Sequence, residues 1–404
     1  LISADLRGYL MRLADRMYRL KTESAFVVLA KAKELEREGR DIVHLEIGDT
    51  DFNTPSNIVE EAYAQMKEGQ THYCPSQGLL DLRQACCEWL RGDGRGDYRP
   101  EEIVVGPGGK PFLHYAIMTL AGPRDEVIYP DPGFPVYESV TLYAGAKAVP
   151  LPILEEKDFR FTPDDLASRV TDRTRLIILN YPHNPTGGTL TRSELDAIAE
   201  IAIKNDIVVL SDEVYAHMLF EGEHISIGTL PGMRERTIML EAFSKTYAMT
   251  GWRLGFVAAP IWLAEPLTQL IINSVSCVAP FAQLAGARAL LGDQTERQAM
   301  MEDFKRRRDI FIPALNEIPG ISCKSPEGAF YAFPNVSQLP MSAEDFAEYL
   351  LEHVGVAALP GSAFGSHAEK HLRMCFATSV ENLEKAIDRI GKAVAQLKEN
   401  GVTS

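Results

Sequence analysis

The chain has 404 residues and a formal net charge of −15, and 46% of its residues are hydrophobic. This length exceeds one ordinary hydrophobic core, so two domains are expected in a globular composition. The negative charge argues against nucleic acid or an anionic membrane as the main partner. The six cysteines show no CxxC pair and no zinc spacing, and no segment reaches the ~18 apolar residues of a membrane span. We therefore expect a cytoplasmic protein with reduced thiols and no metal.

Short apolar runs alternate with helical patterns through the middle of the chain. Continuous hydrophobic runs of this kind suit strands that are covered on both faces, as in parallel sheets. Five strands are expected, over Glu102–Val105, Glu126–Tyr129, Arg175–Leu179, Asp206–Leu210 and Thr237–Leu240. The pattern predicts an α/β fold for residues 51–290, with a mostly parallel, seven-stranded type of sheet and helices on both faces.

Helix start signals lie between these strands. Thr191 and Glu194 form a capping box before an apolar stripe. Thr162, Pro163 and Asp165 mark a second helix start, with Thr162 at the cap and Pro163 in the first turn. These signals favour strand–helix–strand units in the predicted large domain.

The C-terminal third has a different character. Helices are expected over Asp293–Leu315, Ser342–Gly355 and Glu381–Asn400, with strand and turn signals between the first two. Residues 291–404 are therefore predicted to form a smaller α+β domain. Residues 1–50 are predicted to form an N-terminal arm and part of the small domain. A helix over Tyr9–Leu20 would join that domain or reach a partner subunit.

Polar and glycine-rich segments follow the carboxyl ends of the expected strands. In parallel α/β sheets, ligands bind outside that edge. The segments are Gly106–Lys110, Pro130–Phe134, Asn180–Gly188, Ser211–Tyr215 and Ser244–Arg253. We expect them to converge on one ligand site.

Two of these segments suit an anion. Gly108 and Gly109 begin an expected helix, where backbone N–H groups and the positive helix end attract phosphate. Glycines at such a position more often serve only as a turn. Arg253 lies between Gly251 and Gly255 and is either a surface residue or a guanidinium that grips phosphate with two parallel hydrogen bonds.

Four more side chains each permit two interpretations. Asn184, in a turn between two prolines, is an ordinary loop residue or an amide held toward a ligand oxygen. Asp212 is a helix cap or a buried carboxylate, which needs a cationic partner because an unpaired buried charge is costly. Tyr215 lies one turn later on the same side. Phe134 is a core residue or stacks on a planar ring.

Lys245 lies just after the expected strand Thr237–Leu240, in the stretch EAFSKTYAMTGWRLGF. It is either a solvated surface lysine or a reactive amine. Burial and nearby positive charge would lower its pKa, so that the amine could attack a carbonyl near pH 7. An amine, a phosphate seat, a stacking ring and a carboxylate for a ring nitrogen together suit pyridoxal phosphate.

These motifs also carry a family resemblance. The chain resembles fold-type-I pyridoxal-phosphate-dependent aminotransferases of the class I/II family, and is similar to the bacterial aspartate aminotransferase subgroup. The likeness runs from about Lys31 to the C-terminus. Its motifs occur in the family's order: LEIGDTDFNTP, YPHNPTG, SDEVY, SKTYAMTGWRLG, SPEGAFYAFP and LPGSAFG.

The resemblance implies a role for each residue at the cofactor ring. Lys245 would form the Schiff base, and Asp212 would bind the ring nitrogen. Tyr215 and Asn184 would hydrogen-bond the phenolic oxygen of the ring. Phe134 would stack on its face.

The resemblance also implies how the phosphate is bound. Gly108, Gly109 and Lys110 would supply the phosphate loop, joined by Arg253. Tyr73 matches a tyrosine that family members donate to the phosphate of the neighbouring subunit, which implies a homodimer with shared sites.

The chain departs from the family at two phosphate contacts. Ala242 replaces a hydroxyl residue of many relatives, so Ser244, backbone N–H groups or water must supply that contact. The loop GGK also lacks a hydroxyl that some relatives place there.

For the substrate, the resemblance assigns the α-carboxylate to Arg373, with Gly48 and Asn184 lining the same pocket. Lys245 would then move the α-proton as general base and acid. The predicted reaction transfers an amino group from an L-amino acid to a 2-oxo acid by a ping-pong mechanism.

Two other functions stay open at this point. The same residues would serve a pyridoxal-phosphate-dependent lyase, synthase, decarboxylating or oxidative enzyme. A non-catalytic regulatory protein on this scaffold is the third reading, and an intact Lys245, Asp212 and Arg373 argue against it. The amino acid is not specified, because no second arginine can be placed for a distal carboxylate. Tyr18–Phe26 and Ser274–Phe281 are expected to form part of the pocket wall.

Overall fold

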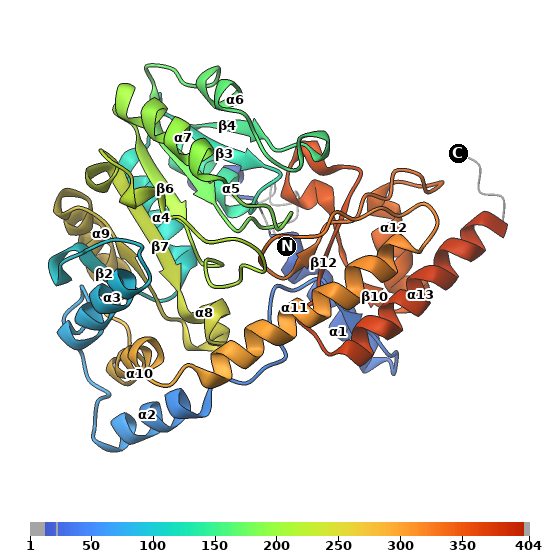
Figure 1. Ribbon diagram of the computed structural model, residues 1–404, viewed down its shortest axis with the longest axis horizontal. Helices are drawn as coiled ribbons and strands as arrows, with labels where there is room; N and C mark the ends of the chain where they lie inside the picture. Colours follow the sequence, from blue (N-terminus) through green and yellow to red (C-terminus); the bar gives the residue numbers. More distant parts are fainter. Residues whose placement is uncertain (1–12, 22, 400–404) are drawn as a thin grey trace.

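The computed structural model describes residues 13–21 and 23–399. A seven-stranded sheet lies at its centre, in the order β2-β8-β7-β6-β5-β3-β4 (Figure 1). Strand β8 is antiparallel to β2 and β7, and the other neighbouring strands are parallel. The strands are β2 Ile103–Gly106, β3 Glu126–Asp131, β4 Lys147–Pro152, β5 Thr174–Asn180, β6 Val208–Asp212, β7 Thr237–Ala242 and β8 Gly255–Ala258.

The five expected strands are all present, within a few residues of their predicted bounds. The predicted α/β class is confirmed. Strands β4 and β8 were not expected from the sequence. Strand β4 is an edge strand with partly exposed residues and two prolines, and β8 has four residues and begins with a glycine, so neither shows a long apolar run.

Helices cover both faces of the sheet (Figure 1). One cluster packs α4 (Gly109–Leu120), α5 (Val136–Ala144) and α9 (Ile261–Ser274) against strand residues such as Ile178 and Leu210. On the other face, α7 (Arg192–Lys204) packs against Ile177 and Val209, and α2 (Ser56–Lys67), α3 (Leu80–Gly92) and α10 (Pro280–Leu291) pack against Val105 and Met239. Neighbouring strand residues therefore serve opposite layers, because side chains alternate along a strand.

The capping residues read from the sequence begin two of the helices. Thr162 accepts a hydrogen bond from the backbone of Asp165 at the start of α6 (Pro163–Ala167). Thr191 and Glu194 form the reciprocal capping box of α7. Both predictions are confirmed.

The C-terminal part has its own hydrophobic core. It packs α11 (Thr295–Asn316), α12 (Ala343–Tyr349) and α13 (Val380–Glu399) around a three-stranded antiparallel sheet. That sheet is formed by β11 Leu359–Pro360, β12 Leu372–Cys375 and β9 Tyr331–Ala332, and a second small sheet pairs β1 Val43–His44 with β10 Val356–Ala357.

Val43 and Leu45, from the N-terminal segment, belong to the same core, next to α1 (Ser24–Arg37). This arrangement supports the predicted division at residues 51–290 and 291–404, with part of 1–50 in the small domain. The division stays a proposal.

Two helix predictions differ in detail. Residues 9–12 of the expected helix Tyr9–Leu20 lie outside the described residues, and its described part holds a 3-10 turn over Asp15–Arg19. The helix expected over Ser342–Gly355 changes after Tyr349 into a wider π turn that ends at Gly355, in the left-handed region at φ +67°.

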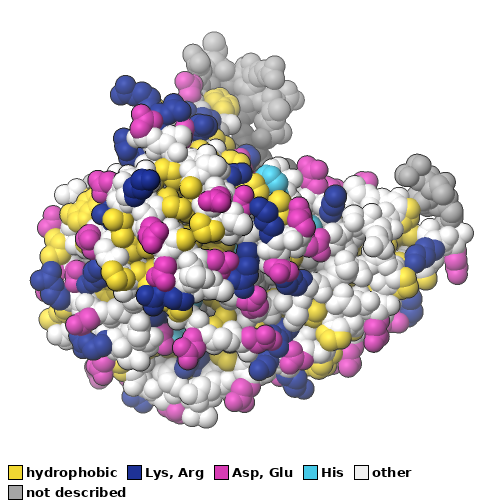
Figure 2. All heavy atoms as spheres, turned by 45° about the horizontal axis from the view of Figure 1, so that its top comes forward, with side chains coloured by type: hydrophobic (Ala, Val, Ile, Leu, Met, Phe, Trp, Pro, Cys, Tyr) yellow, Lys and Arg dark blue, Asp and Glu magenta, His cyan; other side chains and the backbone are white. Residues whose placement is uncertain are grey.

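The surface mixes charges of both signs. On the face drawn in Figure 2, Lys and Arg side chains lie among Asp and Glu. Within residues 13–21 and 23–399, no helix is both long and apolar enough to cross a bilayer.

Candidate active site

A cavity of about 590 Å³ lies at the carboxyl ends of the parallel strands, between the sheet and the C-terminal core. Residues from β5, β6 and β7, from the start of α4 and from β12 line it. Every predicted site residue except Gly108 and Tyr73 belongs to this lining. The expected convergence of the strand-end segments is therefore confirmed, because the parallel strands end at one edge.

Lys245 lies in α8 (Phe243–Thr246), the short helix directly after β7. Burial lowers the pKa of its amine, while the carboxylate of Asp49 partly opposes this shift. The Nζ atom donates a hydrogen bond to the backbone oxygen of Gly48. The structure thus holds a partly buried amine at the cavity wall, where a lowered pKa favours the nucleophilic form.

Asp212 ends β6 and is 5% exposed. Burial raises the pKa of its carboxyl from 3.8 to about 6, although a hydrogen bond from the Tyr137 hydroxyl, 2.7 Å from Oδ2, opposes this rise. Asn180 donates a hydrogen bond to the Asp212 backbone oxygen at 3.1 Å and fixes the strand end. A carboxylate in this setting needs a cationic partner from a ligand.

Tyr215 lies close to Asp212 and faces the small domain. Its hydroxyl is 2.7 Å from the hydroxyl of Tyr331 on β9. A Cβ on Gly48 would lie 2.3 Å from the Tyr331 oxygen, so a larger side chain at position 48 would collide with this pair. This hydrogen bond joins the strand-end side of the cavity to the C-terminal core.

Gly108 and Gly109 form the start of α4, as predicted. Gly108 has φ +90°, and a Cβ there would lie 2.7 Å from a guanidinium nitrogen of Arg253. A Cβ on Gly255 would approach the backbone of Gly108 to 2.8 Å. The backbone therefore packs closely around Arg253 at Gly255, whereas a Cβ on Gly251 would meet nothing within 4 Å.

The guanidinium of Arg253 faces the helix start. It donates hydrogen bonds to the backbone oxygens of Thr250 at 2.8 Å and Pro107 at 3.3 Å. Backbone N–H groups at the start of α4 and this guanidinium together suit a phosphate. Ser244 lines the cavity on the same side, next to the Ala242 methyl group that replaces a hydroxyl.

The side chain of Lys110 forms an ion pair with a carboxylate of the same chain. Its Nζ atom lies 2.6 Å from the carboxylate of Glu23, just before α1. It also lies 5.2 Å from the ring centre of Phe134. The sequence did not indicate the pairing with Glu23.

Arg373 lies on β12 and is 4% exposed. Its guanidinium donates to the backbone oxygen of Glu46 at 2.5 Å and to the side-chain oxygen of Asn184 at 3.4 Å. Its buried Nε atom has no hydrogen-bond partner among the described residues. A guanidinium with an unused donor, next to a substrate-sized cavity, suits a carboxylate.

Phe134 lines the cavity and meets Tyr137 edge-on, with ring centres 5.8 Å apart. Tyr73 lies elsewhere on the chain and is 89% exposed. Of the two expected wall segments, the first contributes Glu23, Ala25 and Phe26.

The prediction for the second wall segment is wrong. No described residue of Ser274–Phe281 lines the cavity. The reason is that Phe281, in the first turn of α10, packs with α2 and α3, and its backbone N–H bonds to the backbone oxygen of Gln70.

Three residues at the site were missed by sequence reasoning. Tyr137 follows Phe134 by one helical turn, and this i, i+3 spacing was the available signal. Tyr331 lies inside the quoted motif SPEGAFYAFP, where nothing separates it from the neighbouring aromatic residues. Glu23 carries no local signal, because its partner is 87 residues away.

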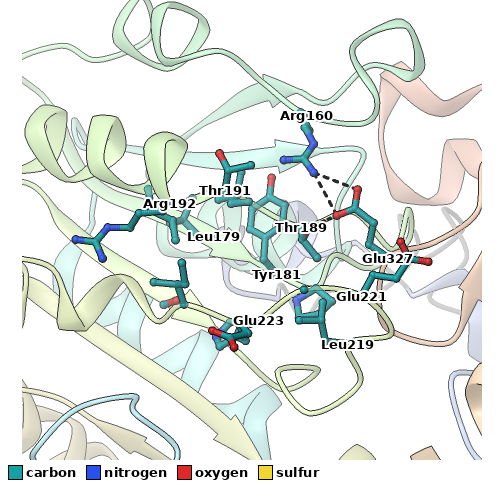
Figure 3. Close-up of a pocket in the computed structure, with 17 residues that line it drawn as sticks. Arg160, Leu179, Tyr181, Thr189, Thr191, Arg192, Leu219, Glu221, Glu223 and Glu327 are labelled. Atoms are coloured by element: carbon teal, nitrogen blue, oxygen red, sulfur yellow. Dashed lines mark hydrogen bonds and ion pairs between the residues drawn. The ribbon is translucent and has the colours of Figure 1, made fainter. Parts of the chain in front are cut away.

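A second cavity, of about 570 Å³, lies beside β5 and the start of α7 (Figure 3). Arg160 and Glu327 form an ion pair there, at 3.1 Å, and Arg192 pairs with Asp196. Among its described lining residues, none belongs to the predicted site. Its arginines are already paired with carboxylates, so the first cavity is the candidate active site.

The first cavity fits pyridoxal phosphate. It offers a partly buried amine for the aldehyde, a phosphate seat at a helix start, an aromatic wall, and a buried carboxylate whose pKa is raised by burial.

Comparisons with known proteins agree with this geometry. The family model described as aminotransferase class I and II matches residues 40–390. An aspartate aminotransferase of Musicola paradisiaca is 38% identical over 386 residues, which cover 95% of this chain and 96% of the relative. An aromatic-amino-acid aminotransferase of Thermococcus litoralis is 37% identical over 392 residues, which cover 96% of this chain and all of the relative.

A solved aminotransferase structure is also similar to this chain. The aspartate aminotransferase of Thermus thermophilus, determined with maleate, superimposes with a TM-score of 0.90 at 35% sequence identity. The match covers 95% of this chain and all of that structure's chain. The chain therefore belongs to the aminotransferase class I and II family, whose members use pyridoxal phosphate to transfer amino groups.

Proposed function

We propose that this aminotransferase moves an amino group from an L-amino acid to a 2-oxo acid, with Lys245, Asp212 and Arg373 at the centre of the reaction. The observation that carries the proposal is the meeting of these three side chains in one cavity, although they come from three separate parts of the chain. Their electrostatic settings differ, and each setting suits a different task.

Arg373 binds the α-carboxylate of the substrate. Its contacts with Asn184 and Glu46 fix the guanidinium, and its Nε donor has no partner among the described residues. A carboxylate held by two parallel hydrogen bonds fixes the α-carbon relative to the amine of Lys245.

Lys245 takes the proton from the substrate α-carbon and returns it later, as general base and then general acid. Burial lowers the pKa of its amine, so the unprotonated form is accessible near neutral pH. When bound, pyridoxal phosphate supplies an electron sink that stabilises the negative charge left on the α-carbon.

Asp212 holds the protonated ring nitrogen of the cofactor. The hydroxyl of Tyr137 stabilises the ionised form of this carboxylate, because it donates a hydrogen bond at 2.7 Å. Tyr215 and Asn184 bind the phenolic oxygen, and Phe134 stacks on the ring. The phosphate is bound by the backbone at Gly108–Lys110, with Arg253 and Ser244.

Amino transfer itself is tested by incubation of the purified protein with amino-acid and 2-oxo-acid pairs. The expected products are the matching oxo acid and amino acid, with parallel lines in initial-rate plots that indicate a ping-pong mechanism. Ammonia or carbon dioxide without amino transfer would instead support a lyase or a decarboxylating enzyme.

A non-catalytic regulatory protein makes a different prediction. It would bind the cofactor without a change of its absorbance on addition of amino acid. We expect that change in the wild-type protein, and we expect Lys245→Ala to lose turnover.

We also propose a homodimer with shared sites. Tyr73 is 89% exposed and lies outside the cavity of its own chain, which suits a residue that reaches the phosphate of the partner subunit. Light scattering is expected to give twice the chain mass of 44.8 kDa. A monomer with full cofactor affinity would contradict the shared site.

A cytoplasmic location is also a proposal. The six cysteines, all free in the structure, support it, because thiols stay reduced in that compartment. Fractionation of the source cells with an antibody would test it.

A further inference from the structure

The cations that line the active-site cavity are not equally available to a substrate. The described cationic lining residues are Lys110, Lys245, Arg253 and Arg373. Under the proposed function, Arg253 serves the phosphate, Arg373 serves the α-carboxylate, and Lys245 acts on the α-carbon. Lys110 is therefore the cation left for a second carboxylate on the substrate.

Lys110 is already paired. Its Nζ atom lies 2.6 Å from Oε2 of Glu23, and these side chains are 38% and 23% exposed. Glu23 lines the same cavity, and its negative charge contributes to raising the pKa of Tyr331. The pair presents no net charge to a ligand.

The surroundings of the pair are apolar and aromatic. The Nζ atom of Lys110 lies 5.5 Å from the ring centre of Phe26 and 5.2 Å from that of Phe134. Ala25, Leu29 and Ile47 extend this wall. A neutral side chain would gain from burial here without disturbing the pair.

A substrate with a second carboxylate meets a different situation. It must displace Glu23 from Lys110 or lie close to the Glu23 carboxylate, and both arrangements place like charges together. We propose that Glu23 is a specificity-determining residue: it neutralises Lys110, so that the enzyme favours amino acids with uncharged side chains over dicarboxylic ones. This inference rests on the proposed function and names its substrate class.

The test compares two donors in the holoenzyme. The ratio of kcat/KM for aspartate to kcat/KM for leucine is expected to be below one in the wild type. Glu23→Gln removes the negative charge and keeps the shape, so the ratio is expected to rise about tenfold or more. In the double variant Glu23→Gln, Lys110→Met, that gain is expected to disappear, because the freed cation is gone.

A matched control contacts α1, the helix that follows Glu23. Glu352 pairs with Lys31 of α1 at 2.5 Å, outside the cavity. Glu352→Gln is expected to leave the donor ratio within twofold of the wild type.

A second readout does not need turnover. Calorimetry of the holoenzyme would compare binding of maleate, a dicarboxylate, with binding of 4-methylvalerate, a monocarboxylate. Glu23→Gln is expected to tighten maleate binding about tenfold relative to 4-methylvalerate. Glu23→Ser also removes the charge and is expected to give the same change in relative maleate affinity. Agreement between the two variants shows that the effect comes from the lost charge.

Two results would overturn the inference: a wild-type preference for aspartate of tenfold or more, or a donor ratio and maleate affinity that Glu23→Gln leaves unchanged. These results differ from failure of the proposed function, which is an absence of amino transfer with every donor. In that case the calorimetric comparison still decides the role of Glu23.

Discussion

Replacement of Asp212 by Asn is expected to stabilise the cofactor-free protein and to weaken the cofactor complex. The carboxylate is buried at the end of β6, and burial raises its pKa from 3.8 to about 6. Without a cationic ligand, the charge at position 212 opposes folding. With the protonated ring nitrogen bound, the same charge stabilises the complex.

The magnitude follows from proton linkage. The folded-state pKa of about 6 lies above the unfolded value of 3.8, so the folded cofactor-free protein binds more protons than the unfolded chain between these values. Its free energy of unfolding therefore falls as the pH rises through this window, by roughly 3 kcal/mol at pH 8. Asp212→Asn has no carboxyl group to titrate at this position. Its free energy of unfolding is therefore expected to exceed that of the cofactor-free wild type by about 3 kcal/mol at pH 8 and by roughly half of that at pH 5.

Thermal unfolding of both proteins, with and without pyridoxal phosphate at pH 5 and pH 8, measures the effect. The variant is expected to melt higher than the wild type when cofactor-free at pH 8, and to gain less from added cofactor. A cofactor-free variant that melts no higher at pH 8, or that gains as much from the cofactor as the wild type, would refute this reasoning.

Further predictions concern the other contacts of the site and a buried ion cluster. Arg373→Lys loses the parallel donor geometry and is expected to lower kcat/KM about 100-fold with little change in cofactor affinity, measured by steady-state kinetics. Tyr137→Phe removes the hydrogen bond to Asp212 and is expected to weaken cofactor binding about tenfold, measured by absorbance titration. Gly108→Ala places a Cβ 2.7 Å from Arg253 at φ +90° and is expected to weaken the binding of both the cofactor and inorganic phosphate. Affinities equal to those of the wild type would contradict this prediction. Arg95→Met leaves the buried Glu241 without its ion-pair partner and is expected to destabilise the protein by about 3 kcal/mol or more, measured by thermal unfolding against the exposed control Arg91→Met.

Much of the fold could be predicted because parallel strands give a strong local signal. Runs such as Arg175–Leu179 are apolar on both faces, and their polar segments must meet at one edge. The positions of Lys245 and Asp212 at that edge follow from the strand ends alone. Strand β8, by contrast, is four residues long and antiparallel, so its place depends on the sheet around it.

Contacts between distant segments could not be predicted in the same way. The pair Glu23–Lys110 and the pair Tyr215–Tyr331 join residues 87 and 116 positions apart. Neither follows from periodicity, capping or strand order, because each depends on how the small domain and the N-terminal segment pack over the sheet. The catalytic edge could therefore be predicted from the sequence, whereas these two long-range pairs could not.

Reduction of the protein with borohydride in the presence of pyridoxal phosphate, followed by peptide mass mapping, tests the central claim most directly. The account predicts one modified peptide, with the cofactor mass on the side chain of Lys245. Labelling of another lysine with position 245 unmodified would contradict it.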